Sequence, residues 1–218
     1  MRYAYYISGK ASRLQEMIRD GRFFHTPSKL IAVISDNLQD SEEIKELCDK
    51  NKVFWSYYDY ENIEKEKSRA VRNEMLSNYI LNTLIKYRID YLFVFGHHLL
   101  SGELLNVYKN RIIVFHPSLL PHHKGFNGID QAIDNGDFVI GNSAFIIDEG
   151  MDTGKVIMQS VEHRSILGDR DYDAALHPIV DMFFYILKAI EDGRLRVGEE
   201  AVIENANYGN VHFFPELD

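Results

Sequence analysis

The strongest signal for chemistry in this sequence is a histidine at the end of an apolar segment. In RIIVFHPSLLPHHKG, residues 111–125, a run of apolar residues ends at His116, and prolines follow at positions 117 and 121. Imidazole titrates near neutral pH, so it can donate or accept a proton in catalysis. Proline fixes the backbone φ angle, which limits how far the loop after the histidine can relax. The segment predicts an acid–base group in a rigid setting.

A second candidate for acid–base chemistry is the turn DEGMDTG, residues 148–154, which contains Asp148, Glu149 and Asp152. Asp and Gly are favoured in any solvated hairpin turn, so this composition has a purely structural explanation. The functional explanation requires one carboxylate to point inward toward His116, where it would orient the imidazole and raise its proton affinity. Spacing alone does not decide between the two explanations.

The segment GKAS, residues 9–12, follows a strand-like run and opens a helix-like one. A turn of this kind offers free backbone N–H groups and the positive end of the helix dipole to an anion such as phosphate. It matches neither GxxxxGK[ST] nor GxGxxG, which disfavours the nucleotide-binding modes that those motifs indicate. On its own, a strand–glycine–helix turn is more often a simple connection.

The other histidines allow more than one interpretation. His97 and His98 follow an apolar strand, so one of them could line a cleft, but two surface histidines need no function. His116, His122 and His123 lie close enough in the sequence to suggest a metal. However, the chain has no HExxH or CxxC spacing, and neighbouring side chains such as His122 and His123 point in different directions. We therefore predict no metal site.

Apolar segments of strand length alternate with amphipathic segments along the first half of the chain. The expected strands are residues 2–8, 29–35, 53–58, 90–96 and 111–116, and the expected helices are 12–19, 41–51, 61–87 and 128–135. Strands that are apolar on both faces and alternate with helices indicate a mainly parallel sheet covered on both sides. Nearer the C-terminus we expect a strand pair, 138–148 and 155–161, and a final helix, 171–191.

These patterns predict one α/β domain over residues 1–218, with a doubly wound, Rossmann-like sheet and a C-terminal strand pair plus helix. Ligands of such sheets bind outside the carboxyl ends of the strands. The candidate strand ends are Ser8–Gly9, Gly96–His98 and His116–Pro117. Any chemistry is therefore expected where these three loops meet.

The composition of the 218 residues is that of a globular protein, with 45% hydrophobic and 26% charged residues. The formal net charge of −9 argues against a general nucleic-acid binder, although a local pocket can still bind an anionic small ligand. The one cysteine, Cys48, cannot form an internal disulfide and fits a reducing compartment. No segment has the pattern of a signal peptide or membrane span, so we expect a cytoplasmic protein.

At HPSLLP, residues 116–121, followed by Lys124–Gly125 and by Asp152–Gly154, the sequence resembles the folate-dependent formyltransferases. The combination of HPSLLP with a later acidic glycine turn is specific. Other segments match in order over nearly the whole chain: Ser8–Gly9, Ser12, Leu14–Gln15, Asp148–Glu149, Gln159, Leu176–Ile179 and Asp192–Leu195. The members that formylate phosphoribosylglycinamide are the most similar, and those that formylate methionyl-tRNA or amino-sugar nucleotides share the core.

The resemblance implies transfer of a formyl group from 10-formyltetrahydrofolate to a primary amine, with no metal. The family uses an Asn–His–Asp trio, in which His116 matches the histidine and Asp152 the aspartate. When the amine attacks the formyl carbon, an oxyanion develops that hydrogen-bond donors must stabilise, and protons must move between the two nitrogens. The resemblance makes His116 a donor and Asp152 the group that tunes it and assists proton transfer.

The asparagine of that trio is missing. It would lie two residues before the histidine, on the same face of the strand, where this chain has Val114. An isopropyl group cannot donate a hydrogen bond, and loss of one oxyanion donor typically costs about 10²–10³ in turnover. The candidates to replace it are Asn127, Asn142, Ser118 and His98.

The resemblance also implies where the substrates bind. The expected contacts are Gly9, Lys10, Ala11, Ser12 and Arg13 for phosphate, Lys124 and Asp173 for the acceptor, and His97, Leu99, Asp148 and Gly150 for folate. Ala11 and Arg13 replace a usual Gly and Asn. Ala11 narrows the space for backbone approach to phosphate, whereas Arg13 could bind phosphate through two hydrogen bonds. Phe145 stands where a histidine is usual.

Several functions agree with these residues. The acceptor could be phosphoribosylglycinamide in purine biosynthesis or an amino-sugar nucleotide for surface polysaccharide. Val114, Phe145 and Ala11 would also fit a folate- or nucleotide-binding relative that is catalytically impaired, but the retained His116 and Asp152 favour an enzyme. Hydrolysis of formyl-folate ranks last, because the related hydrolases carry an additional N-terminal domain. A transfer RNA acceptor is disfavoured by chain length and acidity.

We expect small-molecule partners, no nucleic acid and no membrane, and leave open a homodimer.

Overall fold

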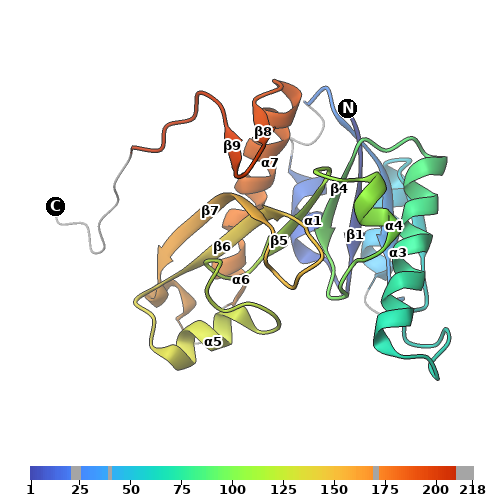
Figure 1. Cartoon of the computed structure of the whole chain (residues 1–218), viewed down its shortest axis with the longest axis horizontal. Coiled ribbons are helices and arrows are strands. Elements are labelled where there is room, and N and C mark those ends of the chain that lie inside the picture. The colour runs from blue at the N-terminus through green and yellow to red at the C-terminus, as the bar shows by residue number, and fades with distance from the viewer. Residues whose placement is uncertain (21–25, 39–40, 169–171, 210–218) are drawn as a thin grey trace.

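A seven-stranded sheet organises the computed structural model, which describes residues 1–20, 26–38, 41–168 and 172–209. Its strands are β1 (Arg2–Ile7), β2 (Lys29–Ser35), β3 (Phe54–Tyr57), β4 (Tyr91–Phe95), β5 (Ile112–His116), β6 (Val139–Ile146) and β7 (Lys155–His163), in the spatial order β3-β2-β1-β4-β5-β6-β7 (Figure 1). The first five strands pair in parallel, and β6 and β7 run antiparallel to their neighbours. The predicted mainly parallel sheet with an added strand pair is confirmed.

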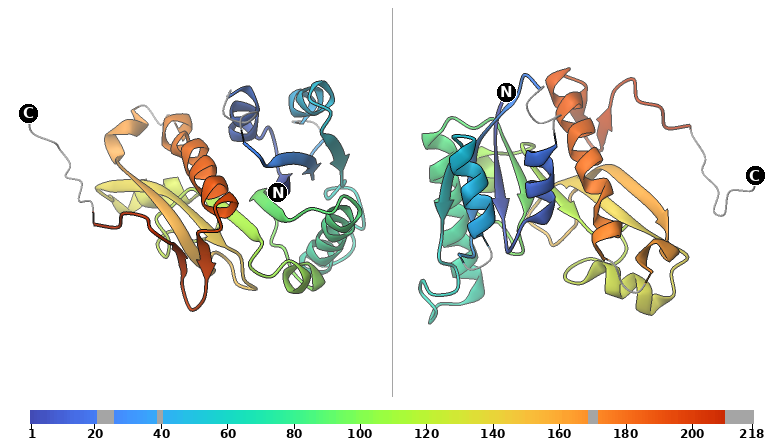
Figure 2. Two further views of the ribbon diagram at one scale, coloured as in Figure 1. Left: turned by 90° about the horizontal axis from the view of Figure 1, so that it is seen from above. Right: turned by 180° about the vertical axis from the view of Figure 1, so that it is seen from behind.

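Helices cover both faces of this sheet. They are α1 (Ser12–Arg19), α2 (Glu42–Lys50), α3 (Arg69–Lys86), α4 (Glu103–Val107), α5 (Gly128–Asn135), α6 (Tyr172–Leu176) and α7 (Pro178–Glu191), with a 3-10 turn η2 (Arg164–Leu167) before α6. Helices α1, α2 and α7 bury their apolar sides on one face, and α3 and α4 on the other (Figure 2). The predicted Rossmann-like layering is therefore also confirmed.

The central strand β1 shows why the strand sequences are apolar throughout. Tyr3, Tyr5 and Ile7 are fully buried in the core beneath α1 and α7, whereas Ala4 and Tyr6 are fully buried in the core beneath α3. A strand that is covered on both faces cannot alternate between apolar and polar residues. Most of the strands could be recognised in the sequence for this reason.

Several boundaries differ from the predictions. Helix α3 begins at Arg69 instead of residue 61. Ser68 caps this start, because its hydroxyl accepts a hydrogen bond from the Val71 N–H at 3.4 Å. The final helix is two helices, α6 and α7, because Pro178 has no N–H to continue α6 and instead starts α7. Its expected start at Asp171 lies outside the described residues. Helix α4 and the hairpin β8 (Leu195–Val197) and β9 (Ala201–Ile203) were not predicted.

The strand ends place the loops that were expected to carry chemistry. The carboxyl ends of β1, β2, β4 and β5 lie at one edge of the sheet because these strands are parallel. The turn between β6 and β7, residues 147–154, starts at the other end of β5, where the Ile147 N–H donates to the Ile112 carbonyl at 3.2 Å. None of the described helices is both long and apolar enough to cross a membrane.

Candidate active site

His116 is the last residue of β5, and its ring is held by the loop that follows. The residue pairs with Ser143 of β6, and its side chain is 10% exposed. Its Nε2 atom lies 3.1 Å from the backbone carbonyl oxygen of His123. A carbonyl oxygen can only accept a hydrogen bond, so Nε2 must carry a proton. The other nitrogen, Nδ1, is then the one that gains or loses a proton.

Asp152 faces that second nitrogen. Its Oδ2 lies 3.7 Å from His116 Nδ1 and accepts a 2.7 Å hydrogen bond from the Gly125 N–H. A distance of 3.7 Å is too long for a direct hydrogen bond but is within ion-pair range. With Nε2 protonated, a neutral His116 would present its Nδ1 lone pair to a carboxylate. Asp152 is therefore placed to interact electrostatically with Nδ1 of His116.

The turn 147–154 reaches Asp152 by folding back along β5. Asp152 has a left-handed φ of 52°, and Gly154 lies so close to β6 that a Cβ would sit 1.9 Å from the Ile146 carbonyl oxygen. Asp148 Oδ1 stabilises the turn by accepting from the Gly150 N–H at 3.0 Å and the Thr153 hydroxyl at 2.7 Å. The acidic turn thus needs its glycines for close approach.

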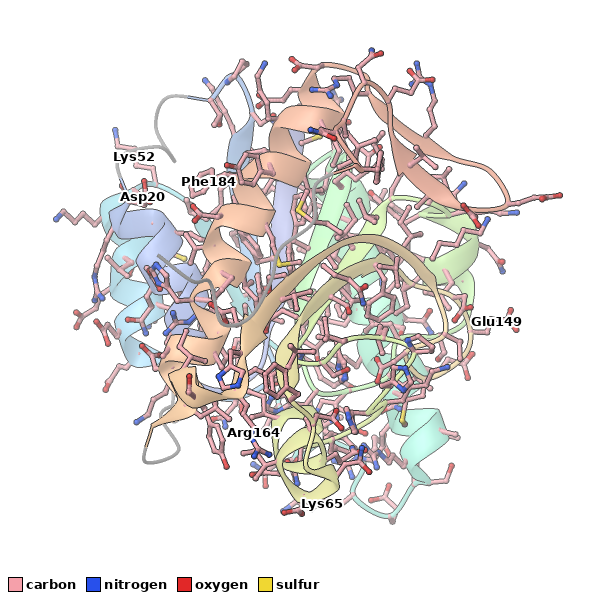
Figure 3. All side chains as sticks on the ribbon, turned by 90° about the vertical axis from the view of Figure 1, so that its left-hand side faces the viewer. Asp20, Lys52, Lys65, Glu149, Arg164 and Phe184 are labelled. Atoms are coloured by element: carbon pink, nitrogen blue, oxygen red, sulfur yellow. The ribbon has the colours of Figure 1, made fainter. Side chains whose placement is uncertain are left out.

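The three acids of this turn have different surroundings. Glu149 is exposed and projects from the surface of the molecule (Figure 3), and Asp148 supports the turn. Asp152, with 15% of its side chain exposed, is the acid whose carboxylate points at His116. This geometry meets the requirement of the functional explanation, which stays a prediction.

The loop 117–127 is tied to three elements behind it. Ser143 Oγ of β6 donates to the Ser118 carbonyl at 2.6 Å and accepts from the Leu120 N–H at 3.0 Å. Gln159 of β7 donates to the Leu120 carbonyl at 2.9 Å, and Gln131 of α5 donates to the Phe126 carbonyl at 2.8 Å. The rigidity predicted for this segment thus comes from side chains on β6, β7 and α5 as well as from its prolines.

Val114 lies on the same face of β5 as His116 and pairs with Phe145 of β6. Phe145 is 2% exposed, and Val114 is half-buried against the core beneath α3. Neither side chain can donate a hydrogen bond. This part of the site is apolar where the resemblance leads one to expect an amide and an imidazole.

Three of the four candidate replacement donors are already engaged. Asn142 is 1% exposed, its Nδ2 donates to Ser160 Oγ at 3.0 Å and to the Ala175 carbonyl at 2.8 Å, and it lies on the opposite face of the sheet from His116. Asn142 is therefore not an oxyanion donor. Ser118, 3% exposed, uses its hydroxyl to donate to the His122 carbonyl at 2.9 Å.

His98 occupies a separate polar cluster at the ends of β1, β2 and β4. Its ring stacks on Tyr60 with 3.5 Å between centroids, and its Nε2 lies 3.5 Å from Asp36 Oδ2. The same oxygen accepts 2.5 Å hydrogen bonds from the hydroxyls of Tyr6 and Ser8. Burial lowers the pKa of His98, an effect that Asp36 opposes. His98 thus faces Asp36 and stacks on Tyr60.

Asn127 is the exposed candidate, and it lies at the start of α5 with a left-handed φ of 59°. The next residue, Gly128, packs directly on the loop after His116, where a Cβ would lie 2.8 Å from the Pro117 carbonyl oxygen. Asn127 is therefore held beside that loop while its amide stays exposed. Of the four candidates, it is the one whose position suits a donor.

The expected phosphate loop is present, with one of its residues engaged elsewhere. Gly9 and Ala11 have left-handed φ angles of 64° and 49°, and no side chain caps α1. Arg13 is 8% exposed and pairs with Glu16 at 2.6 Å and with Asp173. A phosphate would have to displace a carboxylate from Arg13. The idea that Arg13 is free to bind phosphate through two hydrogen bonds is wrong for this structure, whereas Lys10 and Ser12 are exposed.

The structure brings some of the other predicted binding residues together. The His97 N–H donates to Ser8 Oγ at 2.9 Å, which joins the ends of β1 and β4, and Leu99 is half-buried in the same loop. Lys124 is exposed on the loop 117–127. Asp173 lies across from these residues, at the start of α6 against Arg13. Among the described residues, no three His, Cys, Asp or Glu side chains gather as a metal site would require.

The sequence did not identify three polar residues at this edge, Tyr60, Asp36 and Asp137, and it suggested His123 only as a metal ligand. Asp36 could have been found, because it directly follows β2 at the same sheet edge as Ser8 and His97. Tyr60 and the His123–Asp137 contact depend on how loops fold against each other. No local pattern indicates them.

A covered, mainly parallel sheet with a histidine–aspartate pair beside its strand ends defines an α/β enzyme-type site. Residues 1–171 match the family model described as formyl transferase, and the chain therefore belongs to the formyl transferase family. The resemblance drawn from HPSLLP and the acidic turn is confirmed at the level of the family.

Individual relatives carry purine-pathway names. Phosphoribosylglycinamide formyltransferase of Escherichia coli (strain K12) is 26% identical over 200 residues, which cover 79% of this chain and 91% of that enzyme. Trifunctional purine biosynthetic protein adenosine-3 of Chironomus tentans is 33% identical over 81 residues, 37% of this chain but only 6% of that much longer protein. The crystal structure of glycinamide ribonucleotide transformylase 1 from Symbiobacterium toebii has a TM-score of 0.78 and 26% identity, covering 93% of both chains.

Proposed function

We propose that this protein transfers the formyl group of 10-formyltetrahydrofolate to the primary amine of phosphoribosylglycinamide. The observation that carries the proposal is the placement of Asp152 against Nδ1 of His116 at 3.7 Å, while the His123 carbonyl fixes the proton on Nε2. An imidazolium beside a carboxylate can both donate a hydrogen bond to a developing oxyanion and relay a proton.

In the proposed reaction, the amine nitrogen attacks the formyl carbon and a new C–N bond forms. The formyl oxygen gains negative charge and accepts a hydrogen bond from Nδ1–H of His116. The bond between the formyl carbon and the folate nitrogen then breaks. The amine loses one proton and the folate nitrogen gains one, and Asp152, partly exposed at the same point, assists this transfer. No other reactant is needed.

The surroundings of the His116–Asp152 pair support a formyl donor that has a flat, partly apolar ring system. Phe126 and Met151 are 51% and 49% exposed, and Met151 Sδ lies 3.3 Å from the position of a Cβ on Gly125. The Gly125 N–H is the group that holds Asp152. Exposed aromatic and thioether side chains beside a catalytic pair can cover an aromatic ring system such as a pterin. This is where we propose that the folate binds.

The choice of acceptor is supported by relatives that align along most of the chain and carry the names of glycinamide ribonucleotide enzymes. The second candidate acceptor is an amino-sugar nucleotide. The contacts of Arg13 support this second acceptor, because a phosphate at residues 9–13 would compete with Glu16 and Asp173 for the guanidinium. An acceptor whose phosphates bind elsewhere would not meet that competition.

The test is a direct assay. The protein is incubated with 10-formyltetrahydrofolate and, in turn, phosphoribosylglycinamide, an amino-sugar nucleotide or water alone, and release of tetrahydrofolate is followed. We expect release that depends on phosphoribosylglycinamide. Release with the amino sugar only would make that the acceptor, and release in water alone would indicate hydrolysis. Folate binding without release under any condition would contradict the enzyme and identify a binding relative.

A further inference from the structure

We propose that His123 and Asp137 form a positioning pair that holds His116 in its Nε2-protonated form through the backbone carbonyl of His123. The kinetic part of this inference rests on the proposed function, whereas its structural part does not. Neither residue is expected to touch a substrate. Their role would be to place one carbonyl oxygen.

The contact between the two side chains joins the loop 117–127 to the end of α5. His123 Nε2 lies 2.5 Å from Asp137 Oδ2, and the other carboxylate oxygen accepts from Asn135 Nδ2 at 2.5 Å. The Asp137 N–H donates to the Ala132 carbonyl at 3.0 Å, so α5 fixes the backbone of the aspartate. The pair is partly buried, with 14% of the His123 and 27% of the Asp137 side chain exposed. A short hydrogen bond from an imidazole N–H to a carboxylate can hold a loop.

The backbone of His123 shows what the pair holds in place. Its φ of 53° is left-handed, a conformation that is unfavourable for a residue with a Cβ. Non-glycine residues keep such angles only where the surroundings enforce them, and they gather at functional sites. Here the side chain reaches Asp137 while the carbonyl oxygen of the same residue reaches His116 at 3.1 Å. The strained backbone therefore connects the two contacts.

The space behind the pair is small. A cavity of about 10 Å³ borders His123 and Asp137 and is lined by Pro117, Ser118, Ile129 and Ala132. That volume is enough for about one water molecule. Truncation of His123 would enlarge this cavity and disturb the loop for reasons unrelated to hydrogen bonding. The variants at His123 should therefore keep the volume of its side chain.

The charge on Asp137 is well supported. Hydrogen bonds from Asn135 first and His123 second lower the pKa of Asp137, and the neighbouring His122 contributes in the same direction. The carboxylate is therefore ionised at neutral pH and can anchor the imidazole of His123. His122, whose ring centroid is 6.3 Å from that of His123, is the other titratable group that faces the pair.

The consequence for His116 follows from the chemistry of imidazole. While the His123 carbonyl accepts from Nε2, a neutral His116 has its lone pair on Nδ1, next to Asp152. If the loop shifts, Nε2 loses that partner and the proton distributes between the two nitrogens. The fraction of His116 that is ready to exchange a proton at Nδ1 then falls.

The experiment uses full-length protein labelled with ¹⁵N-histidine, in which the ring nitrogens of His116 are assigned by loss of their signals in His116→Gln. We expect the wild type to show the Nε2–H tautomer at pH above the His116 titration. His123→Phe and Asp137→Ala should each give a mixture of tautomers and lower kcat by about tenfold with KM changed less than twofold. His123→Gln, whose amide nitrogen can reach Asp137, should restore both readouts. His122→Gln is the matched control.

Two results would overturn the inference. One is an unchanged His116 tautomer and kcat in His123→Phe and Asp137→Ala, and the other is an equal loss in the control His122→Gln. Should His123→Phe fail to fold, Asp137→Ala tests the pair from the other side. A failure of the proposed function can be distinguished from a failure of this inference. If no variant or wild type transfers a formyl group, the tautomer of His116 still reports on the positioning pair.

Discussion

Oδ2 of Asp152 lies 3.7 Å from Nδ1 of His116, although the turn that carries Asp152 begins at the opposite end of β5 from His116. His116 ends that strand, and the turn carrying Asp152 begins beside Ile112 and returns along the sheet. The pair thus forms across a face of the sheet. This geometry makes the pair dependent on the fold of the turn as well as on the two side chains.

Replacing either member of the pair should abolish formyl transfer. His116→Ala removes the proposed donor to the oxyanion, and Asp152→Asn keeps the hydrogen bond from Gly125 but removes the negative charge that faces Nδ1 of His116. We expect kcat to fall by at least about 10² in each variant, the effect typical for loss of one such group. Glu149→Gln, an exposed residue of the same turn, is the control and should retain activity. Retained turnover in Asp152→Asn would refute its assigned role.

Val114→Asn should raise turnover. The side chain would lie on the same face as His116 and could donate to the developing oxyanion, which is worth about 10²–10³ at other sites. The substitution should also destabilise the fold. Without substrate, the new amide beside Phe145 lacks hydrogen-bond partners, which should lower the free energy of unfolding by about 1–3 kcal/mol.

The measurements are kcat with the accepted amine and chemical denaturation of both proteins, with Val94→Asn as a comparison on the neighbouring strand. An unchanged kcat in Val114→Asn would mean that another donor already serves the oxyanion. Asn127→Ala should then lower kcat, because Asn127 is the exposed candidate beside the loop.

Protonation of His98 should destabilise the fold in mildly acidic solution. Burial lowers its pKa below the ordinary 6.5, with Arg69 and His97 acting in the same direction and Asp36 and Glu61 opposing it. Below pH 6.5 the unfolded chain binds a proton that folded His98 does not, so the free energy of unfolding falls as the pH decreases. One proton limits this slope to about 1.4 kcal/mol per pH unit.

The measurement is urea denaturation between pH 5 and 8, where His98→Gln should flatten the slope that the wild type shows below about 6.5. His98→Gln also loses the stacking of the ring on Tyr60, which lowers the free energy of unfolding at every pH. This loss does not affect the slope against pH. His97→Gln, the exposed neighbour, should change the slope only slightly, because His97 has the smallest effect on the pKa of His98. A wild-type slope that survives in His98→Gln would assign the effect to another group.

Gly154→Ala should damage both the turn and the site. The new methyl group would lie 1.9 Å from the Ile146 carbonyl oxygen and 2.9 Å from Phe145, and neither can move without disturbing β6. Overpacking of this kind typically costs about 1–3 kcal/mol. Turnover should fall by more than the loss of folded protein explains, because Asp152 lies two residues away in the turn.

The comparison for this variant is Gly198→Ala, where no atom lies within 4 Å of the added methyl group and little change is expected. Thermal unfolding and turnover measured on both proteins separate the two cases. Equal stability of the two variants would show that the turn can relax around Gly154.

The sequence predicted the fold well because each central strand is buried on both faces, which leaves a nearly continuous apolar run. β1 and β5 are clear examples. Elements that lack this pattern were missed: α4 has five residues, and the hairpin β8–β9 has strands of three residues. The break between α6 and α7 follows from Pro178, which periodicity does not detect.

The site was predictable where a residue type carries its own chemistry, as His116 does, and where the family resemblance supplied a partner. The state of Arg13 was not predictable, because Glu16 is on its own helix but Asp173 comes from a distant segment. Asn142 was misjudged for a related reason. Its side chain faces α6 across the sheet, and only the register of β6 shows which face that is.

The return of the turn 147–154 along β5 divides the His116–Asp152 pair into a fixed half and a variable half. His116 cannot move, because β5 is paired on both sides, whereas Asp152 is carried by a connection between two adjacent antiparallel strands. Such a connection can change in length and sequence without altering the sheet. Efforts to change the proposed formyl donor should therefore diversify the exposed Glu149 and Met151, and leave Asp148, Gly150 and the strand untouched.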